Sequence, residues 1–171
     1  MEVIKIIREA DIGEDFPSPL SYTKRITARA IVFDTDGNMA LLNVTHKGHH
    51  KLPGGGIEEG ESIEGALVRE LVEEIGCQVM NVCELGIIEE YRNKTGKHQV
   101  SYCFIADVLG VKGLPNLDED EIADGSETVW TPLEQAIKIL ENEMTSIDSY
   151  GGKFINLREL SFLKEAYTSL R

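Results

Sequence analysis

The segment from residue 53 to residue 77 limits the possible folds of this chain more than any other. It contains three consecutive glycines at positions 54–56, then acidic residues, then apolar side chains that recur with the period of a helix. The helix is predicted from Ser62 to about Ile75, and Gly76 can end it because glycine tolerates a left-handed backbone. Apolar, β-branched runs typical of strands precede and follow the segment. A helix that connects strands indicates an α/β fold.

The rest of the chain alternates between strand-like and helix-like patterns. Strands are predicted at residues 2–8, 24–33, 39–45, 79–91 and 98–109, with a short one at ETVW, residues 127–130. Two further helices are predicted, at about 132–144 and about 156–170, because Thr131 and Asn156 can each open a capping box. Helices mixed with long hairpins favour a mixed β-sheet covered on both faces, an α/β/α sandwich.

Three connections stand out by composition. The turn DTDGN, residues 34–38, is built from Asp and Gly and predicts a hairpin between the two strands that flank it. Residues 46–51, HKGHHK, are expected to form a basic loop. Residues 110–126 are expected to form an acidic loop.

The charge and size of the chain exclude several classes of protein. Its 17 Lys and Arg against 30 Asp and Glu give a net charge of −13. This balance argues against binding to DNA or long RNA, whose phosphates need a basic face, and against a polybasic membrane-surface protein. No apolar run approaches the roughly 18–20 residues that a membrane-spanning helix needs. With 171 residues, a single domain over 1–171 is expected.

The cysteines indicate a reducing compartment. Cys77, Cys83 and Cys103 are odd in number and form no C-x-x-C pair, which predicts neither a disulfide framework nor a zinc site. The N-terminus has no cleavage site of a signal peptide and is interpreted as a strand. We therefore expect a cytoplasmic protein with reduced thiols.

The predicted helix places three carboxylates on one face. Glu70, Glu73 and Glu74 stand at i, i+3 and i+4, and their like charges repel each other. Such a cluster becomes favourable around a hard divalent cation, and Mg²⁺ takes oxygen ligands while leaving positions for water and substrate phosphates. Glu61 can approach the same face from the preceding loop, and the glycines at 54–56 allow a backbone carbonyl to come close.

This segment resembles the Nudix box, G-x5-E-x7-R-E-U-x-E-E-x-G-U, in which U is a bulky aliphatic residue. The matching residues are Gly55, Glu61, Arg69, Glu70, Leu71, Glu73, Glu74 and Gly76. The last U is Cys77, a mild departure that affects no ligand. The segments KLPGG before the box and VWTPLEQAI after it extend the resemblance to MutT-like Nudix hydrolases over roughly residues 24–140.

The resemblance implies metal-dependent hydrolysis of a diphosphate. Nudix enzymes typically cleave a nucleoside diphosphate linked to another group, using Mg²⁺ or Mn²⁺ and attack of water at phosphorus. It implies that metal is bound by Glu70, Glu73, Glu74 and the carbonyl of Gly54. Arg69 would hold these glutamates by ion pairing.

The same resemblance leaves the general base open between a box glutamate and a carboxylate on a distant loop. Among the acids of LDEDEIADGSE, Glu121 is the preferred base or extra ligand, with Glu119 as second choice. The alternative is that all six acids of this loop face solvent.

Substrate contacts are predicted at Gly55, Glu61, Arg29 and Lys51. Two basic clusters are further candidates for holding distal phosphates: Lys47, His49, His50 and Lys51, and Arg92, Lys94, Lys97 and His98. Ordinary exposed loop charges are the alternative for the clusters, and a salt bridge is the alternative for Arg29. Trp130 and Tyr91 could stack on a base or simply pack in the core.

The expected activity is hydrolysis of a small nucleoside diphosphate derivative, such as a nucleoside triphosphate, a nucleotide sugar or a dinucleoside polyphosphate. One alternative is a catalytically silent nucleotide-binding or regulatory module on the same scaffold. Another is a diphosphate isomerase, which would use Cys103 as its catalytic thiol. A monomer or a homodimer is expected, the latter through the exposed edge of residues 2–8.

Overall fold

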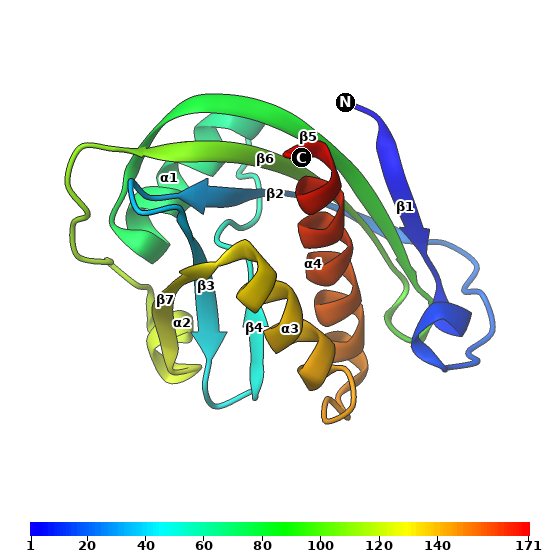
Figure 1. The fold of residues 1–171 in the computed structure, drawn as a ribbon. Helices are drawn as coiled ribbons and strands as arrows, with labels where there is room; N and C mark the ends of the chain where they lie inside the picture. The colour runs from blue at the N-terminus through cyan, green and yellow to red at the C-terminus, as the bar shows by residue number, and fades with distance from the viewer.

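The computed structural model describes all 171 residues, and a seven-stranded mixed sheet forms its centre (Figure 1). The strands are β1 Val3–Ile7, β2 Thr23–Phe33, β3 Asn38–Val44, β4 His49–Lys51, β5 Gln78–Arg92, β6 Lys97–Leu109 and β7 Ser126–Pro132. They are hydrogen-bonded in the order β1-β5-β6-β2-β3-β4, and β7 also pairs with β3. β1 runs parallel to β5 and β2 parallel to β6, while the other pairs are antiparallel. The predicted mixed sheet is confirmed.

The turn at residues 34–38 joins two strands that separate at once. β2 and β3 share one pair of residues, Phe33 and Met39, at the turn itself. Beyond that pair β2 continues beside β6, and β3 lies between β4 and β7. The sheet therefore separates between β2 and β3 beyond the turn.

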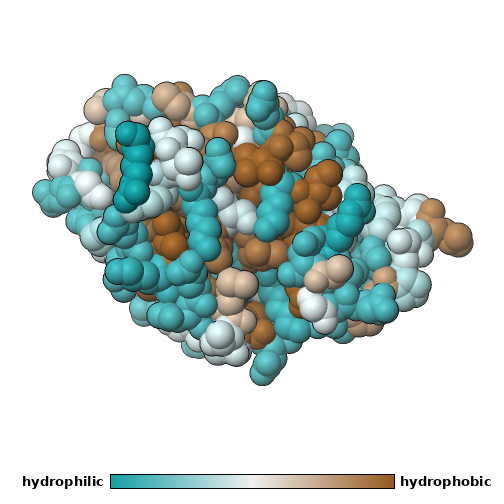
Figure 2. Space-filling model, turned by 45° about the vertical axis from the view of Figure 1, so that its right-hand side comes forward, coloured by the Kyte–Doolittle hydropathy of each residue, from teal (hydrophilic) through white to brown (hydrophobic).

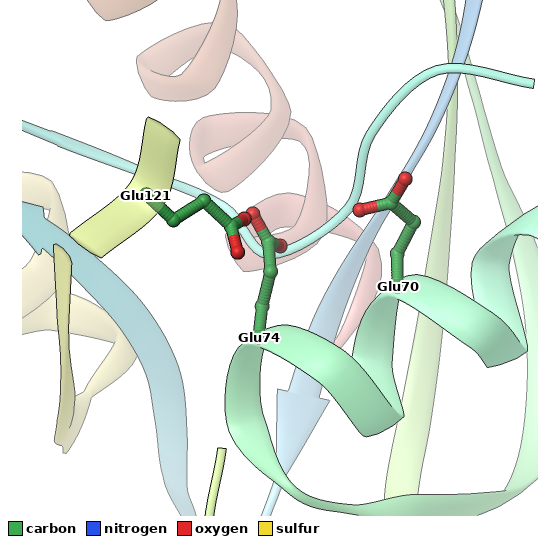
Figure 3. Close-up of side chains that lie close together, drawn as sticks. All are labelled: Glu70, Glu74 and Glu121. Carbon is green, nitrogen blue, oxygen red and sulfur yellow. The ribbon is translucent and has the colours of Figure 1, made fainter. Parts of the chain in front are cut away.

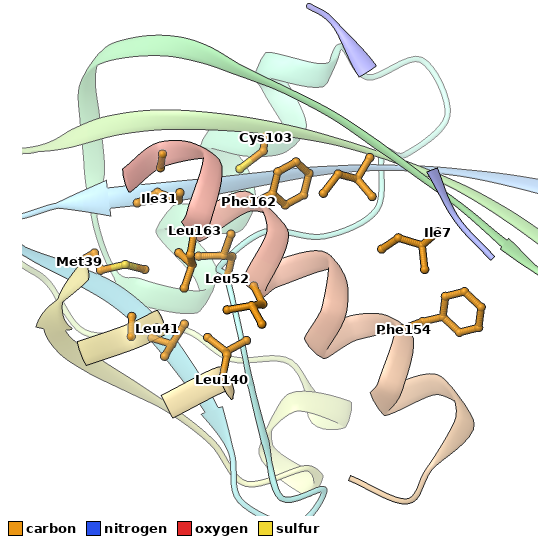
Figure 4. Close-up of a cluster of buried hydrophobic side chains, with 14 residues drawn as sticks. Ile7, Ile31, Met39, Leu41, Leu52, Cys103, Leu140, Phe154, Phe162 and Leu163 are labelled. Carbon is orange, nitrogen blue, oxygen red and sulfur yellow. The ribbon is translucent and has the colours of Figure 1, made fainter. Parts of the chain in front are cut away.

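Helices cover both faces of the sheet. They are α1 Ile63–Ile75, α2 Glu119–Ala123, α3 Leu133–Glu143 and α4 Tyr150–Ser169, with short 3₁₀ turns η1 Glu9–Ile12 and η2 Asn93–Thr95. α1 packs with Leu67 and Leu71 on a core that includes Ala30 and Val32 of β2. α3 and α4 bury the opposite face, in a core that Figure 4 shows around Phe162. This arrangement is the predicted α/β/α sandwich.

Three local predictions were wrong. Residues 46–51 are not entirely loop, since His49–Lys51 form β4 and pair with β3. Thr131 does not cap a helix, because it belongs to β7 and pairs with Met39, so that α3 has Pro132 at its N-cap without a side-chain hydrogen bond. The acidic loop also contains the short helix α2, which Asp118 caps.

The last helix begins six residues earlier than the predicted 156. Its N-cap is Ser149, whose hydroxyl accepts a hydrogen bond from the amide of Gly152. Asn156 lies inside the helix and donates to the carbonyl of Leu140, at 3.0 Å. Glycines at 151 and 152 concealed this first turn, since glycine lowers helix propensity.

The surface is mainly polar, and Figure 2 shows apolar patches interspersed with hydrophilic side chains on the face it presents. No helix of the structure combines the length and apolar character needed to cross a membrane. All three cysteines are free, with Cys77 and Cys103 buried and Cys83 exposed.

Candidate active site

The glutamates of α1 extend from the edge of its core-facing side, where Glu74 is buried, to the exposed side. Ser62 caps the helix by accepting from the amide of Gly65, and Gly76 ends it in a left-handed conformation, φ 65°. The three glutamates differ in exposure. The side chain of Glu74 is 1% exposed, that of Glu70 is 14% exposed and that of Glu73 is 41% exposed.

Glu121 completes a carboxylate cluster with two of these residues. One oxygen each of Glu70, Glu74 and Glu121 lies within 4.8 Å of the others. Figure 3 shows Glu70 and Glu74 rising from α1 while Glu121 points toward Glu74 from α2. Glu121 is oriented locally, because its Oε2 accepts from the amide of Asp118 at 3.0 Å. Two helices thus supply one site, although Glu74 and Glu121 are 47 positions apart in the sequence.

The donor set of this cluster fits a hard divalent cation. All three groups are carboxylates, the ligand type that Mg²⁺ and Mn²⁺ prefer. Burial raises the pKa of Glu74 to about 7, although the nearby Lys51 and Arg29 lower it. A cation placed among the three oxygens would offset both the burial of charge and the mutual repulsion.

Arg69 connects the glutamates to the preceding loop. Its guanidinium donates to Glu61 through Nε and Nη2, each at 3.0 Å, and to Glu70 at 2.8 Å and Glu73 at 3.2 Å. A fifth hydrogen bond goes to the carbonyl of Gly56, at 3.1 Å. The hydrogen bond with Glu61 raises the pKa of Arg69, against a smaller effect of burial. The carboxylate of Glu73 is directed to Arg69 instead of the three-acid cluster.

The glycine loop lies directly against the carboxylates. The amide of Gly54 donates to Glu74 Oε2, and the carbonyl of Gly54 accepts from Arg29. Gly54 has φ 125°, and a Cβ there would lie 2.1 Å from the carbonyl oxygen of Ala28. A Cβ on Gly55 would lie 2.3 Å from Glu70 Oε1. Only glycine allows this approach, which is why the turn and the cluster occur together.

A basic cleft of about 620 Å³ adjoins the cluster. Its charged lining comprises Arg25, Arg29, Lys47, His49, Lys51, Arg158, Asp120, Glu121 and Asp124. Burial lowers the pKa of His49, which leaves the cationic character of the cleft to the five Lys and Arg side chains. A second hollow of about 380 Å³ contains Glu70 and Glu73, and Glu121 borders both.

The structure places the first basic cluster at the site and disperses the second. Lys47, His49 and Lys51 line the cleft, and Lys51 Nζ lies 2.9 Å from Glu74 Oε1. His50 contacts Glu143 on the far side. Of the second cluster, Arg92 is buried beside Glu90, His98 pairs with Glu89 at 2.8 Å, and Lys94 lies over the rings of Phe16 and Tyr150.

Two cleft residues were missed from the sequence. Arg25 and Arg29 are four residues apart in one strand. Because side chains alternate between the two faces of a strand, the sequence could have placed Arg25 on the same face as Arg29. Arg158 comes from the middle of α4, and no local pattern relates it to the glutamates of α1.

The candidate aromatic residues and thiol lie elsewhere. Tyr91 stacks on His98 with ring centroids 4.3 Å apart, and Trp130 is covered by Lys112, so neither lines the cleft. Cys103 is fully buried in the core with its pKa raised by burial. The isomerase alternative therefore lacks an accessible thiol at the site.

Comparisons of the sequence find a matching family model and several similar proteins. A family model described as NUDIX domain matches residues 23–150. The chain is 39% identical over 90 residues to diphosphoinositol polyphosphate phosphohydrolase 3-alpha of Mus musculus, covering 53% of this chain and 51% of that protein. It is 35% identical over 82 residues to ADP-ribose pyrophosphatase of Methanocaldococcus jannaschii, covering 46% and 48%. The chain spans about half the length of these curated relatives.

Solved structures share the fold. A NUDIX hydrolase from Nitrosomonas europaea aligns with a TM-score of 0.62 at 19% identity, covering 87% of this chain and 92% of that one. A MutT protein from Bacillus halodurans aligns with a TM-score of 0.55 at 22% identity, covering 73% and 80%. At these identities the similarity concerns the fold alone.

Proposed function

Since this chain belongs to the Nudix family, we propose that it is a pyrophosphohydrolase that cleaves the diphosphate of a small phosphorylated molecule with a divalent cation. The observation that carries the proposal is the convergence of Glu70, Glu74 and Glu121 beside a basic cleft. Carboxylates repel phosphate, so these acids suit a phosphate-processing site when a cation joins the two.

Glu70, Glu74 and Glu121 would hold Mg²⁺ or Mn²⁺, with the carbonyl of Gly54 nearby and Glu73 facing the adjoining hollow. A bound divalent cation supplies charge neutralisation at phosphate oxygens and lowers the pKa of water. Arg69 keeps the glutamates oriented through its hydrogen bonds, and Glu61 anchors the loop by accepting two of them.

Proton removal from the attacking water is assigned to Glu121. Its Oε2 accepts from the amide of Asp118, so Glu121 offers Oε1 either to the cation or to the proton of the attacking water. Glu121 borders both hollows and so stands between the box glutamates and the basic cleft. Lys51, which lines that cleft, and Gly55, which lies against Glu70, would contact the scissile diphosphate. Arg29, also in the cleft lining, would contact another phosphate of the substrate.

The substrate class follows from the names of relatives and from the cleft. Diphosphoinositol polyphosphates and ADP-ribose, after which two relatives are named, both contain a diphosphate. The cleft is sized for a small molecule of this kind, such as a nucleotide derivative. We propose a cytoplasmic monomer or homodimer over the single domain 1–171, with neither DNA, long RNA nor membrane as a partner.

The test is a Glu70→Gln variant assayed against a panel of diphosphates with Mg²⁺ or Mn²⁺. Gln has nearly the same shape as Glu70 and can still accept from Arg69, so the fold should survive, whereas turnover should fall at least about a hundredfold because several kcal/mol of charge stabilisation depend on the metal site. Phosphate release after phosphatase coupling gives the rate.

Glu64→Gln is the matched control, since Glu64 lies on the exposed first turn of α1 and should leave turnover unchanged. Full turnover in Glu70→Gln would contradict the proposal. Tight nucleotide binding by the wild-type protein without product over hours would favour the silent binding module instead.

A further inference from the structure

The floor of the basic cleft contains two buried guanidinium groups. Arg29 of β2 is 7% exposed and Arg158 of α4 is 2% exposed, and both line the cleft. Neither residue is in the acidic cluster on α1. Arg25 lies at the exposed mouth of the same cleft.

Arg158 is held in place by a network of buried charges. Its Nη1 donates to Glu90 at 3.1 Å, and its Nη2 donates to Glu159 at 2.6 Å. Glu90 also accepts from Arg92 at 2.6 Å. Both glutamates are fully buried. Because charge burial is costly, a rigid guanidinium at the wall of a cleft calls for an explanation beyond packing.

Arg29 has no carboxylate partner. Its hydrogen bonds come from Nη1 and go to the carbonyls of Leu52, at 3.1 Å, and Gly54. Its Nε is buried and unpaired. Burial lowers the pKa of Arg29, and repulsion from Arg158 lowers it further, which indicates that the two cations influence each other.

Arg29 is the guanidinium in this region that no carboxylate contacts directly. Arg92 and Arg158 form ion pairs with Glu90 and Glu159, whereas Arg29 interacts with Glu159, Glu74 and Glu70 only at longer range. An anion between Arg29 and Arg158 would relieve their repulsion and could accept the free N–H of Arg29. The apolar lining of the cleft is limited to Val44, Ala123 and Ile155, and no Phe, Tyr or Trp lines it, so the lining favours a charged ligand over a stacked base.

We infer that Arg29 and Arg158, with Arg25 at the mouth, form a second anion subsite that binds a phosphate group outside the scissile diphosphate. The inference rests on the proposed function and deepens it. The substrate would be a small, multiply phosphorylated molecule, with its extra phosphates either on a ring or along a linear chain.

Binding of inositol hexakisphosphate by calorimetry in Mg²⁺ tests the subsite without turnover, because this probe contains no diphosphate. Arg29→Lys and Arg25→Gln should each weaken binding about tenfold, the effect of losing one charge-assisted contact. Arg25 is exposed, so its variant should fold. Lys24→Gln is the matched control and should bind like wild type, since Lys24 is the exposed neighbour of Arg25 outside the cleft lining.

Kinetics separate the two sources of phosphate. A diphosphoinositol polyphosphate carries phosphates on a ring, diadenosine pentaphosphate carries a linear chain, and ADP-ribose has only its diphosphate. If the subsite binds ring phosphates, Arg25→Gln should raise the KM for the diphosphoinositol polyphosphate about tenfold relative to the KM for ADP-ribose. If it binds a linear chain, the KM for diadenosine pentaphosphate should rise by this factor instead. In both cases kcat should be retained.

Equal binding of the hexakisphosphate by wild type, Arg29→Lys and Arg25→Gln would overturn the inference. An equal rise in KM for all three substrates would also overturn it, because the arginines would then act on the scissile diphosphate. Arginine-dependent binding with no hydrolysis of any substrate would leave the subsite standing and refute the proposed hydrolase.

Discussion

At the scale of single residues, Arg69 determines how the acidic face of α1 can exist before a cation arrives. Its one guanidinium contacts Glu61, Glu70 and Glu73 as well as a backbone carbonyl. A planar fork can serve several oxygens at once, which an ammonium group cannot. The glutamate that remains outside this arrangement, Glu74, is instead paired with Lys51.

Arg69→Lys should therefore weaken metal affinity and kcat/KM about 10–100-fold, the usual effect of losing a residue that orients metal ligands. Titration of Mn²⁺ and steady-state rates measure both quantities. Arg171→Lys, at an exposed arginine remote from the site, is the control. Wild-type affinity in Arg69→Lys would show that the glutamates need no such support.

At the scale of elements, the end of α1 is tied to the loop that leads to α2. The carbonyl of Gly76 accepts from the amide of Gly113 at 2.9 Å, and the carbonyl of Glu73 accepts from the amide of Asn116 at 2.7 Å. α2 carries Glu121, so the termination of one helix helps to place the carboxylate of another.

Gly76→Ala should lower the free energy of unfolding by about 2–4 kcal/mol. Gly76 has φ 65°, and a Cβ there would lie 2.7 Å from the backbone of Gly113 and Leu114, so strain adds to steric overlap. Gly60→Ala is the matched control: it has φ 81° but open space around its Cβ, and should cost only about 1 kcal/mol. Urea unfolding measures both, and equal losses would mean that the contact with the loop is unimportant.

At the scale of the whole molecule, the 30 Asp and Glu side chains make the free energy of unfolding depend on pH in the acid range. Asp34 is one carboxylate whose protonation should matter. It accepts from the amides of Asp36 and Asn38 and from Lys112 at 2.5 Å, which connects the turn after β2 to the loop after β6. Desolvation raises the pKa of Asp34, but these hydrogen bonds outweigh it and hold the pKa below its usual range.

A carboxylate with a depressed pKa stabilises the fold above its unfolded pKa and loses that effect as the pH falls through its folded pKa. The difference in unfolding free energy between wild type and Asp34→Asn should thus be largest above about pH 5 and shrink below about pH 4. Asp15→Asn, at an exposed position, is the control. A pH-independent difference, measured by urea unfolding, would contradict this account.

Much of the architecture could be predicted because its signals are local. The spacing of Leu67 and Leu71 predicted α1, and Gly76 predicted its end. The wrong predictions also had local causes: Thr131 suits both a helix cap and a strand, and its pairing with Met39 decided the matter. Tertiary pairing overrides propensity where one residue serves two patterns.

By itself the sequence determined which residues of α1 share a face, since helical geometry requires only spacing. It also determined that residues 54–56 can form a tight turn, because glycines accept backbone conformations that other residues rarely adopt. Only the tertiary structure decided that Glu121 joins Glu74 and that Arg158 lies beside Arg29. These partners come from separate elements, and their distances depend on how helices pack on a sheet, which no local spacing encodes.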